Sequence, residues 1–212
     1  MTTFILVRHG ESMANKTKSY AGHIDIPLSE EGFLQAEAVS RYIEENFKVD
    51  AVYSSDLSRA YDTIKPFADR CNLTMEKRKE LREVNVGLLQ GMNFEDVEKE
   101  YPGLFTEIKE KPDSFRYPEG ESYRDVAKRG REIFAEMAKK NPGNTVLVAS
   151  HNGFLRTSLC TLTGLALSEL ESVTGFPNAS VTVLRYEDGK AEVLIKGFAD
   201  YLENISRRNE DG

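Results

Sequence analysis

Two short, uninterrupted apolar segments constrain the fold of this chain more than any other feature. Thr3 to Val7 reads TFILV and residues 145–150 read TVLVAS, with no alternation of polar and apolar residues. Such runs are typical of strands that are buried on both faces of a parallel sheet. Residues 50–55 and 73–78 predict two further short strands. Residues 179–199 predict a hairpin with its turn at Asp188-Gly189.

Helical patterns separate these strands. Ser29 suits an N-cap, and Pro66 predicts a kink or break in the second helix. Strands that alternate with helices imply an α/β fold with a mainly parallel sheet and helices on both faces, and the closing hairpin makes the sheet mixed. The expected helices cover residues 27–47, 57–70, 93–102, 121–140 and 154–162.

The length of 212 residues fits a single domain, 1–212. Residues 85–120 are its least patterned part. Within them, residues 103–120 carry Pro112, Pro118 and Gly120 and predict an irregular insertion of the kind that forms a lid or binding loop. The tail from about residue 203 is expected to fray.

The composition excludes several classes of function. A formal net charge of −7 argues against partners such as nucleic acid or an anionic membrane. No apolar run approaches the ~18 residues that span a bilayer, and the first residues lack the basic region of a signal peptide. The two cysteines form no metal-ligand pattern. We therefore expect a cytoplasmic protein with no membrane partner.

Arginine and histidine residues follow three of the predicted strands. Arg8 and His9 follow the first, Arg59 comes shortly after the strand at 50–55, and His151 follows TVLVAS. Sites in open α/β sheets form beyond the carboxyl ends of the strands, so these side chains are expected to converge. Paired arginines match the oxygens of a phosphoryl group, and a histidine can accept it covalently. We expect no metal, because His23 lies in a loop and no HxH or HExxH spacing exists.

The residues around these histidines resemble the histidine phosphatase superfamily, the phosphoglycerate mutase-like proteins. A lone Arg-His-Gly would be weak evidence, but five motifs follow one another in the family's order. They are Leu6-Val7-Arg8-His9-Gly10-Glu11-Ser12 with Asn15, Gly22-His23-Ile24-Asp25-Ile26-Pro27-Leu28, Ser54-Ser55-Asp56-Leu57-Ser58-Arg59-Ala60, Leu81-Arg82-Glu83 and Ser150-His151-Asn152-Gly153. The resemblance implies a three-layer α/β/α sandwich.

The resemblance also implies roles for these residues. His9 would be the nucleophile that becomes phosphohistidine. Arg8, Arg59 and His151 would hold the phosphate, and Glu83 would donate a proton to the leaving oxygen. A carboxyl group beside an anion holds its proton more readily, which suits this role. The substrate-binding residues would then be Arg8, His9, Asn15, His23, Arg59, Glu83, His151 and Asn152.

Each assignment has a structural alternative. Arg59 could pair with Asp56 or Asp62 at the surface, Asn15 could only cap a loop, and His23 could border the pocket without touching substrate. Glu80 is the rival to Glu83 as the acid. The phenylalanines of the 85–120 segment could belong to the core instead of the substrate wall.

Three activities remain compatible with these motifs. We expect a metal-independent, cofactor-free phosphatase acting on a small phosphomonoester. A cofactor-dependent phosphoglycerate mutase is the alternative. The resemblance to such mutases would place a tyrosine and a lysine at the positions where this chain has Val86 and Phe94. A phosphate-binding regulatory module without turnover is the second alternative. The loss of basic groups and the gain of Phe94 suggest a partly apolar substrate, whose identity the sequence leaves open together with the choice between monomer and homodimer.

Overall fold

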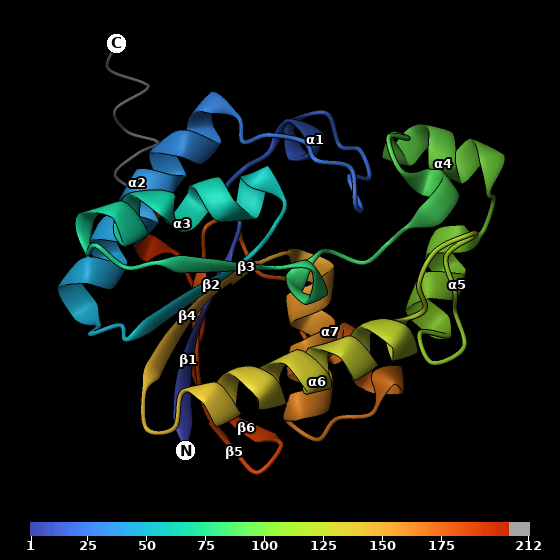
Figure 1. Ribbon diagram of the computed structural model, residues 1–212. Helices are drawn as coiled ribbons and strands as arrows, with labels where there is room; N and C mark the ends of the chain where they lie inside the picture. Colours follow the sequence, from blue (N-terminus) through green and yellow to red (C-terminus); the bar gives the residue numbers. More distant parts are fainter. Residues whose placement is uncertain (204–212) are drawn as a thin grey trace.

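The computed structural model describes residues 1–203 and shows a six-stranded mixed sheet with helices on both sides (Figure 1). The strand order is β3-β2-β4-β1-β5-β6. The strands are β1 (Thr2–Arg8), β2 (Ala51–Ser55), β3 (Met75–Arg78), β4 (Thr145–Ser150), β5 (Val181–Glu187) and β6 (Lys190–Phe198). The prediction of a mixed, mainly parallel sheet is confirmed.

The strand registers place the candidate residues at one edge. β1 pairs in parallel with β4, so that Arg8 lies opposite Ser150, and β4 pairs in parallel with β2. β5 runs antiparallel to β1, and β6 runs antiparallel to β5. The hairpin turn lies at Asp188-Gly189 as expected, with positive φ of 49° and 81°. Since β1, β2 and β4 point the same way, the segments that follow them meet beyond a common edge.

Helices cover both faces of the sheet (Figure 1): α2 (Glu30–Asn46) and α3 (Ser58–Arg70) lie on one side, and α6 (Tyr123–Lys140) and α7 (Asn152–Leu162) on the other. The side chain of Phe4 joins the core under α6 and α7, whereas Ile5 joins the core under α2 and α3. Successive side chains of β1 are therefore buried on opposite faces, which explains why its sequence does not alternate. The expected α/β/α sandwich is confirmed.

The predicted break at Pro66 and the wholly irregular insertion at 103–120 are not what the structure shows. Pro66 does not break α3, which continues on both sides of it. The segment 103–120 is not wholly irregular, because it contains α5 (Leu104–Glu110), which follows α4 (Phe94–Glu100). Gly103 adopts the left-handed conformation with φ of 84° and lets the chain enter α5 directly after Pro102. Figure 1 shows α4 and α5 beside the start of α6, away from the sheet.

Residues 204–212, most of the tail that was expected to fray, lie outside the described residues. Among residues 1–203, no helix has the length and apolar character needed to cross a bilayer. A short helix, α1 (Met13–Lys16), follows β1 at the edge where the candidate site forms.

Candidate active site

His9 follows β1 directly and is held as a neutral ring with one nitrogen free. Its Nδ1–H donates to the carbonyl oxygen of Gly10 at 2.7 Å, so Nε2 carries the lone pair. The side chain is only 5% exposed. Burial, followed by the charges of Arg59 and Arg8, lowers the pKa of His9 well below its ordinary value. These conditions suit a nucleophile.

His151 follows β4 and lies beside His9, with 5.2 Å between the ring centroids. Its Nε2 is 2.9 Å from Ser55 Oγ, which itself accepts the backbone N–H of Leu57. The hydroxyl of Ser55 can therefore donate to Nε2, which leaves the proton of His151 on Nδ1. Nδ1 is buried without a hydrogen-bond partner. Burial, with the nearby charge of Arg59, lowers the pKa of His151. The ring therefore offers one unused N–H donor next to the nucleophile.

Arg8 and Arg59 flank the two histidines. Arg59 is 1% exposed, and it donates to the carbonyl oxygens of Ile24 at 2.9 Å and Gly22 at 2.8 Å. Arg8 donates to the carbonyl oxygen of Phe176, while its Nε is buried without a partner. Burial lowers the pKa of both guanidinium groups, and the carboxylate of Glu83 opposes that effect. Two cations with incompletely used donors are thus concentrated around His9.

Glu83 reaches the same place from the loop after β3. Its Oε1 accepts the backbone N–H groups of Val84 and Phe154, both at 2.9 Å, and its Oε2 accepts that of Gly153 at 3.1 Å. Gly153 and Phe154 belong to the first turn of α7, whose unpaired N–H groups attract an anionic group. The carboxylate is therefore fixed in direction by backbone donors.

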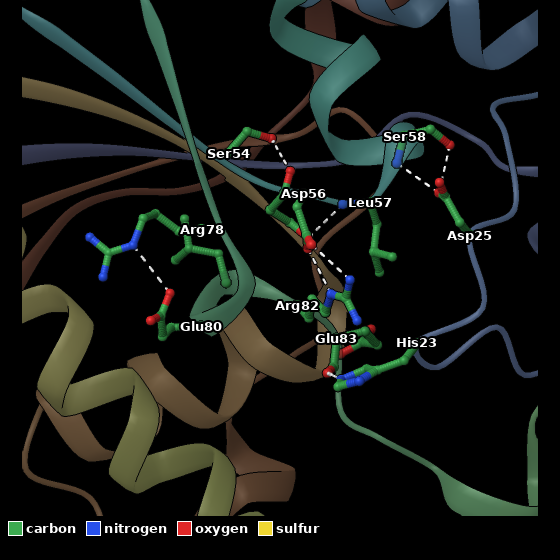
Figure 2. Close-up of polar contacts among 12 residues, drawn as sticks. His23, Asp25, Ser54, Asp56, Leu57, Ser58, Arg78, Glu80, Arg82 and Glu83 are labelled. Atoms are coloured by element: carbon green, nitrogen blue, oxygen red, sulfur yellow. Dashed lines mark hydrogen bonds and ion pairs between the residues drawn. The ribbon is translucent and has the colours of Figure 1, made fainter.

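The structural alternatives for Arg59 and Glu83 do not hold. Asp56 pairs through both oxygens with Arg82, at 2.6 and 2.7 Å, and not with Arg59 (Figure 2). Glu80, the rival acid, is exposed and pairs with Arg78 at 3.1 Å. Of the two carboxylates in this loop, only Glu83 lines the cavity next to His9.

Asn15 caps α1 and also lies on the cavity wall. Its Oδ1 accepts the backbone N–H of Ser12 at 3.0 Å, which closes the capping box of α1, and it also accepts the Nδ2–H of Asn178 at 3.2 Å. It also lines the cavity. Asn152 lines the cavity as well, and its Oδ1 accepts the backbone N–H of Phe176 at 2.9 Å.

His23 does not lie on the cavity wall. Its Nε2–H donates to the carbonyl oxygen of Glu83 at 2.9 Å (Figure 2). Its backbone N–H donates to Gln90 Oε1 at 2.6 Å. Burial lowers the pKa of His23, so the ring that makes this bond is neutral. The structure places His23 behind the loop of the proposed acid and not against substrate.

A cavity of about 330 Å³ opens over His9. Its lining includes apolar and aromatic side chains, among them Phe94 and Phe105 but not the buried Phe115. The sequence reasoning missed Tyr20, Tyr117, Tyr123 and Arg156, of which only Arg156 had a visible signal, one helical turn after Asn152. The lining residues are Arg8, His9, Ser12, Ala14, Asn15, Ser19, Tyr20, Ala21, Gly22, Arg59, Glu83, Val84, Val86, Phe94, Phe105, Ile108, Tyr117, Tyr123, Asn152, Gly153 and Arg156.

Within residues 1–203, no group of three or more His, Cys, Asp or Glu side chains is arranged to hold a metal ion. The cavity wall carries the imidazole of His9, the guanidinium groups of Arg8 and Arg59 and the carboxylate of Glu83, and the fully buried imidazole of His151 lies beside His9. This set suits the transfer of a phosphoryl group to a histidine.

Comparisons with known proteins agree with this geometry. Residues 4–197 match the family described as histidine phosphatase superfamily (branch 1). The chain belongs to this superfamily. It is 34% identical to phosphoserine phosphatase 1 of Hydrogenobacter thermophilus, over 92% of this chain and 91% of that protein. It is 32% identical to a metal-independent phosphoserine phosphatase of Arabidopsis thaliana, over 90% and 79% of the two chains.

Solved structures give the same result. Mycobacterial glucosyl-3-phosphoglycerate phosphatase, in a complex with VO3, superposes with a TM-score of 0.86 and 28% identity, over 93% of this chain and 99% of the other. Other relatives carry names of phosphoglycerate mutases or mutase-like proteins. This chain is thus an enzyme of the histidine phosphatase type, as its motifs predicted.

Proposed function

We propose that the protein hydrolyses a phosphomonoester through a phosphohistidine on His9, without a metal ion. The observation that carries this proposal is the state of His9: its Nδ1–H is committed to Gly10, and its neutral ring lies on the cavity wall between two arginines. A nucleophile in this state needs no further base to remove a proton.

In the first step, the phosphoryl group of the ester docks against Arg8, Arg59 and the Nδ1–H of His151. Nε2 of His9 attacks phosphorus, a P–N bond forms, and the bond from phosphorus to the leaving oxygen breaks. Glu83, which carries a proton when the ester binds, donates it to that oxygen, because an alkoxide is a poor leaving group. The arginines neutralise the charge that spreads over the remaining phosphoryl oxygens.

In the second step, Glu83 accepts a proton from a water molecule as that water attacks phosphorus. The P–N bond breaks, inorganic phosphate leaves, and both His9 and Glu83 return to their starting states. The carboxylate is suited to both steps because backbone N–H groups of Val84, Gly153 and Phe154 keep its oxygens in one place.

The cavity walls support a substrate with an apolar or aromatic body. Phe94, Phe105, Tyr117 and Tyr123 line the same cavity as His9. Beside Arg8 and Arg59, Arg156 is the single further cation among the described lining residues, and it already donates to the carbonyl oxygens of Val173 and Leu170 at 2.9 and 3.1 Å. A substrate with many anionic groups would find few partners here. This favours the phosphatase over the mutase reading.

Hydrolysis of p-nitrophenyl phosphate by wild type and His9→Ala tests the core of the proposal. We expect activity in wild type, loss of it in the variant, and a phosphoenzyme that is labile in acid but stable in alkali, as a phosphoramidate is. Equal activity of the two proteins would refute the assignment of the nucleophile. A regulatory module would show no hydrolysis in either protein.

A second assay separates the phosphatase from the mutase. The enzyme is incubated with 3-phosphoglycerate and 2,3-bisphosphoglycerate, and 2-phosphoglycerate is measured against released phosphate. We expect phosphate to dominate. Rapid formation of 2-phosphoglycerate would overturn the phosphatase assignment while leaving the phosphohistidine in place.

A further inference from the structure

We propose that Arg129 is a positioning residue that sets the place of Glu83 for proton transfer. Arg129 lies on α6, outside the cavity lining, and belongs to none of the motifs that mark the active site. The inference rests on the proposed role of Glu83. It adds that helix α6, through Arg129, positions the loop that carries Glu83.

The guanidinium group of Arg129 holds the backbone of the loop that carries Glu83. Its Nη1 donates to the carbonyl oxygens of Glu80 at 2.9 Å and Arg82 at 2.8 Å, and its Nη2 donates to that of Glu83 at 2.9 Å. Three carbonyl oxygens within four residues are thereby fixed by one planar group. A small rotation of this loop would move the Glu83 carboxylate relative to the leaving oxygen.

The remaining donors of Arg129 go to Glu121. Nε donates to its Oε1 at 2.8 Å and Nη2 to its Oε2 at 3.0 Å, and the same Oε2 accepts the backbone N–H of Asn85 at 2.8 Å. All five N–H donors of an arginine side chain are thus used. Arg129 and Glu121 therefore form an ion pair that holds residues 80–85 from both sides, and we call this pair the clamp.

Arg129 also lies against the element that binds the carboxylate itself. Its guanidinium carbon is 4.8 Å from the ring centroid of Phe154, a cation–π contact, and the backbone N–H of Phe154 donates to Glu83 Oε1. The same side chain therefore contacts both supports of Glu83, its backbone and its anion-binding helix turn. Lysine could not replace it, because an ammonium group lacks the planar fork.

The test uses the dependence of the reaction on its leaving group. An alkyl phosphate needs a proton on the leaving oxygen, whereas 2,4-dinitrophenyl phosphate releases a stable phenolate and does not. The quantity measured is kcat/KM, which reports the formation of phosphohistidine even where its hydrolysis limits kcat. The proteins are wild type, Glu83→Gln, Arg129→Gln and the double variant, with Arg131→Gln, an exposed arginine of the same helix, as the matched control.

We expect Glu83→Gln to lose about 10²- to 10⁴-fold on the alkyl ester, the usual contribution of a general acid, and little on the dinitrophenyl ester. Arg129→Gln should show the same preference with a loss of about 10- to 100-fold, as for a displacement of up to 1 Å. When Glu83 is already replaced by glutamine, Arg129→Gln should change the ratio of kcat/KM between the two esters by less than about 3-fold. Arg131→Gln should resemble wild type.

Two outcomes overturn the inference, and they differ from each other. If Arg129→Gln lowers kcat/KM equally for both esters, while Glu83→Gln lowers it mainly for the alkyl ester, Arg129 only stabilises the fold and the proposed function stands. If Glu83→Gln itself does not discriminate, the acid role fails and the inference fails with it. Should Arg129→Gln not fold, Glu121→Gln removes one side of the clamp, and unchanged discrimination by that variant would equally contradict the proposal.

Discussion

The substitution Gly153→Ala tests the placement of Glu83 by a single methyl group. Gly153 is the second residue of α7 and lies outside the left-handed region of φ, so alanine fits its backbone. A Cβ atom there would lie 2.6 Å from Glu83 Oε1 and 2.9 Å from Val84 Cγ2. Oε1 must therefore retreat by about 0.8 Å to reach the 3.4 Å of ordinary contact.

This displacement is large for proton transfer. A shift of about 1 Å can cost about 100-fold in rate, so kcat/KM for an alkyl phosphate should fall by roughly 10- to 100-fold. Alanine gains up to about 1 kcal/mol of helix propensity over glycine, and the weakened bond from the Gly153 N–H costs a similar amount. The buried Val84 must also give way, which costs about 1–3 kcal/mol of overpacking, so the free energy of unfolding should fall by about 1–3 kcal/mol.

The assay is kcat/KM for an alkyl phosphate and for 2,4-dinitrophenyl phosphate, with denaturant unfolding of each protein. Thr161→Ala serves as the control, because it lies eight residues further along α7, about 12 Å away along the axis. Activity on the alkyl ester that equals wild type would refute the reasoning, since the carboxylate could then move without effect. A loss that is equal for both esters would show that the methyl group disturbs the phosphate pocket instead.

Three further predictions concern protonation, substrate and metal. The pKa values of buried His9 and His151 lie below the ~6.5 of an unfolded histidine, so below that pH the unfolded chain binds protons that the folded chain excludes. The free energy of unfolding should fall by up to about 1.4 kcal/mol per pH unit per histidine between pH 6.5 and 5, and denaturant unfolding of His9→Gln should show a shallower fall. Phe94→Ala should lower kcat/KM for naphthyl phosphate about 2- to 10-fold relative to glycerol phosphate, the worth of one aromatic contact; an unchanged ratio would remove Phe94 from the substrate wall. Chelation with EDTA should leave kcat/KM unchanged, and a loss restored by added Mg²⁺ or Zn²⁺ would contradict the proposed mechanism.

The sheet and the convergence of His9, His151 and the arginines could be predicted because their causes are local in sequence. Uninterrupted apolar runs predict buried strands, and the polar residues that follow such parallel strands meet at a common edge of the sheet. His9 and His151 could thus be brought together although the chain between them is long. The helix Leu104–Glu110 escaped prediction because Pro112, Pro118 and Gly120 further along the segment suggested an irregular insertion, whereas Gly103 with its positive φ begins a helix.

The role of His23 and the presence of Arg129 could not be predicted for a different reason. Both act on backbone carbonyl groups of the loop around Glu83, and a carbonyl acceptor leaves no trace in the amino-acid sequence. The position of His23 within a phosphatase motif favoured substrate contact, but the fold turns its ring towards Glu83 instead. Such contacts depend on which segments lie next to one another, and only the folded structure shows this.

All three histidines of the chain have lowered pKa values, and each is useful as a neutral ring. In the proposed mechanism His9 keeps Nε2 free to attack phosphorus and His151 offers an N–H to a phosphoryl oxygen, while His23 donates its N–H to the carbonyl oxygen of Glu83. Protonation would affect them differently, because a charged His151 would bind a phosphate dianion more tightly, whereas a charged His9 could not attack. We therefore expect a loss of phosphoryl transfer in acid to report the protonation of His9, and anion binding to persist where turnover has ceased.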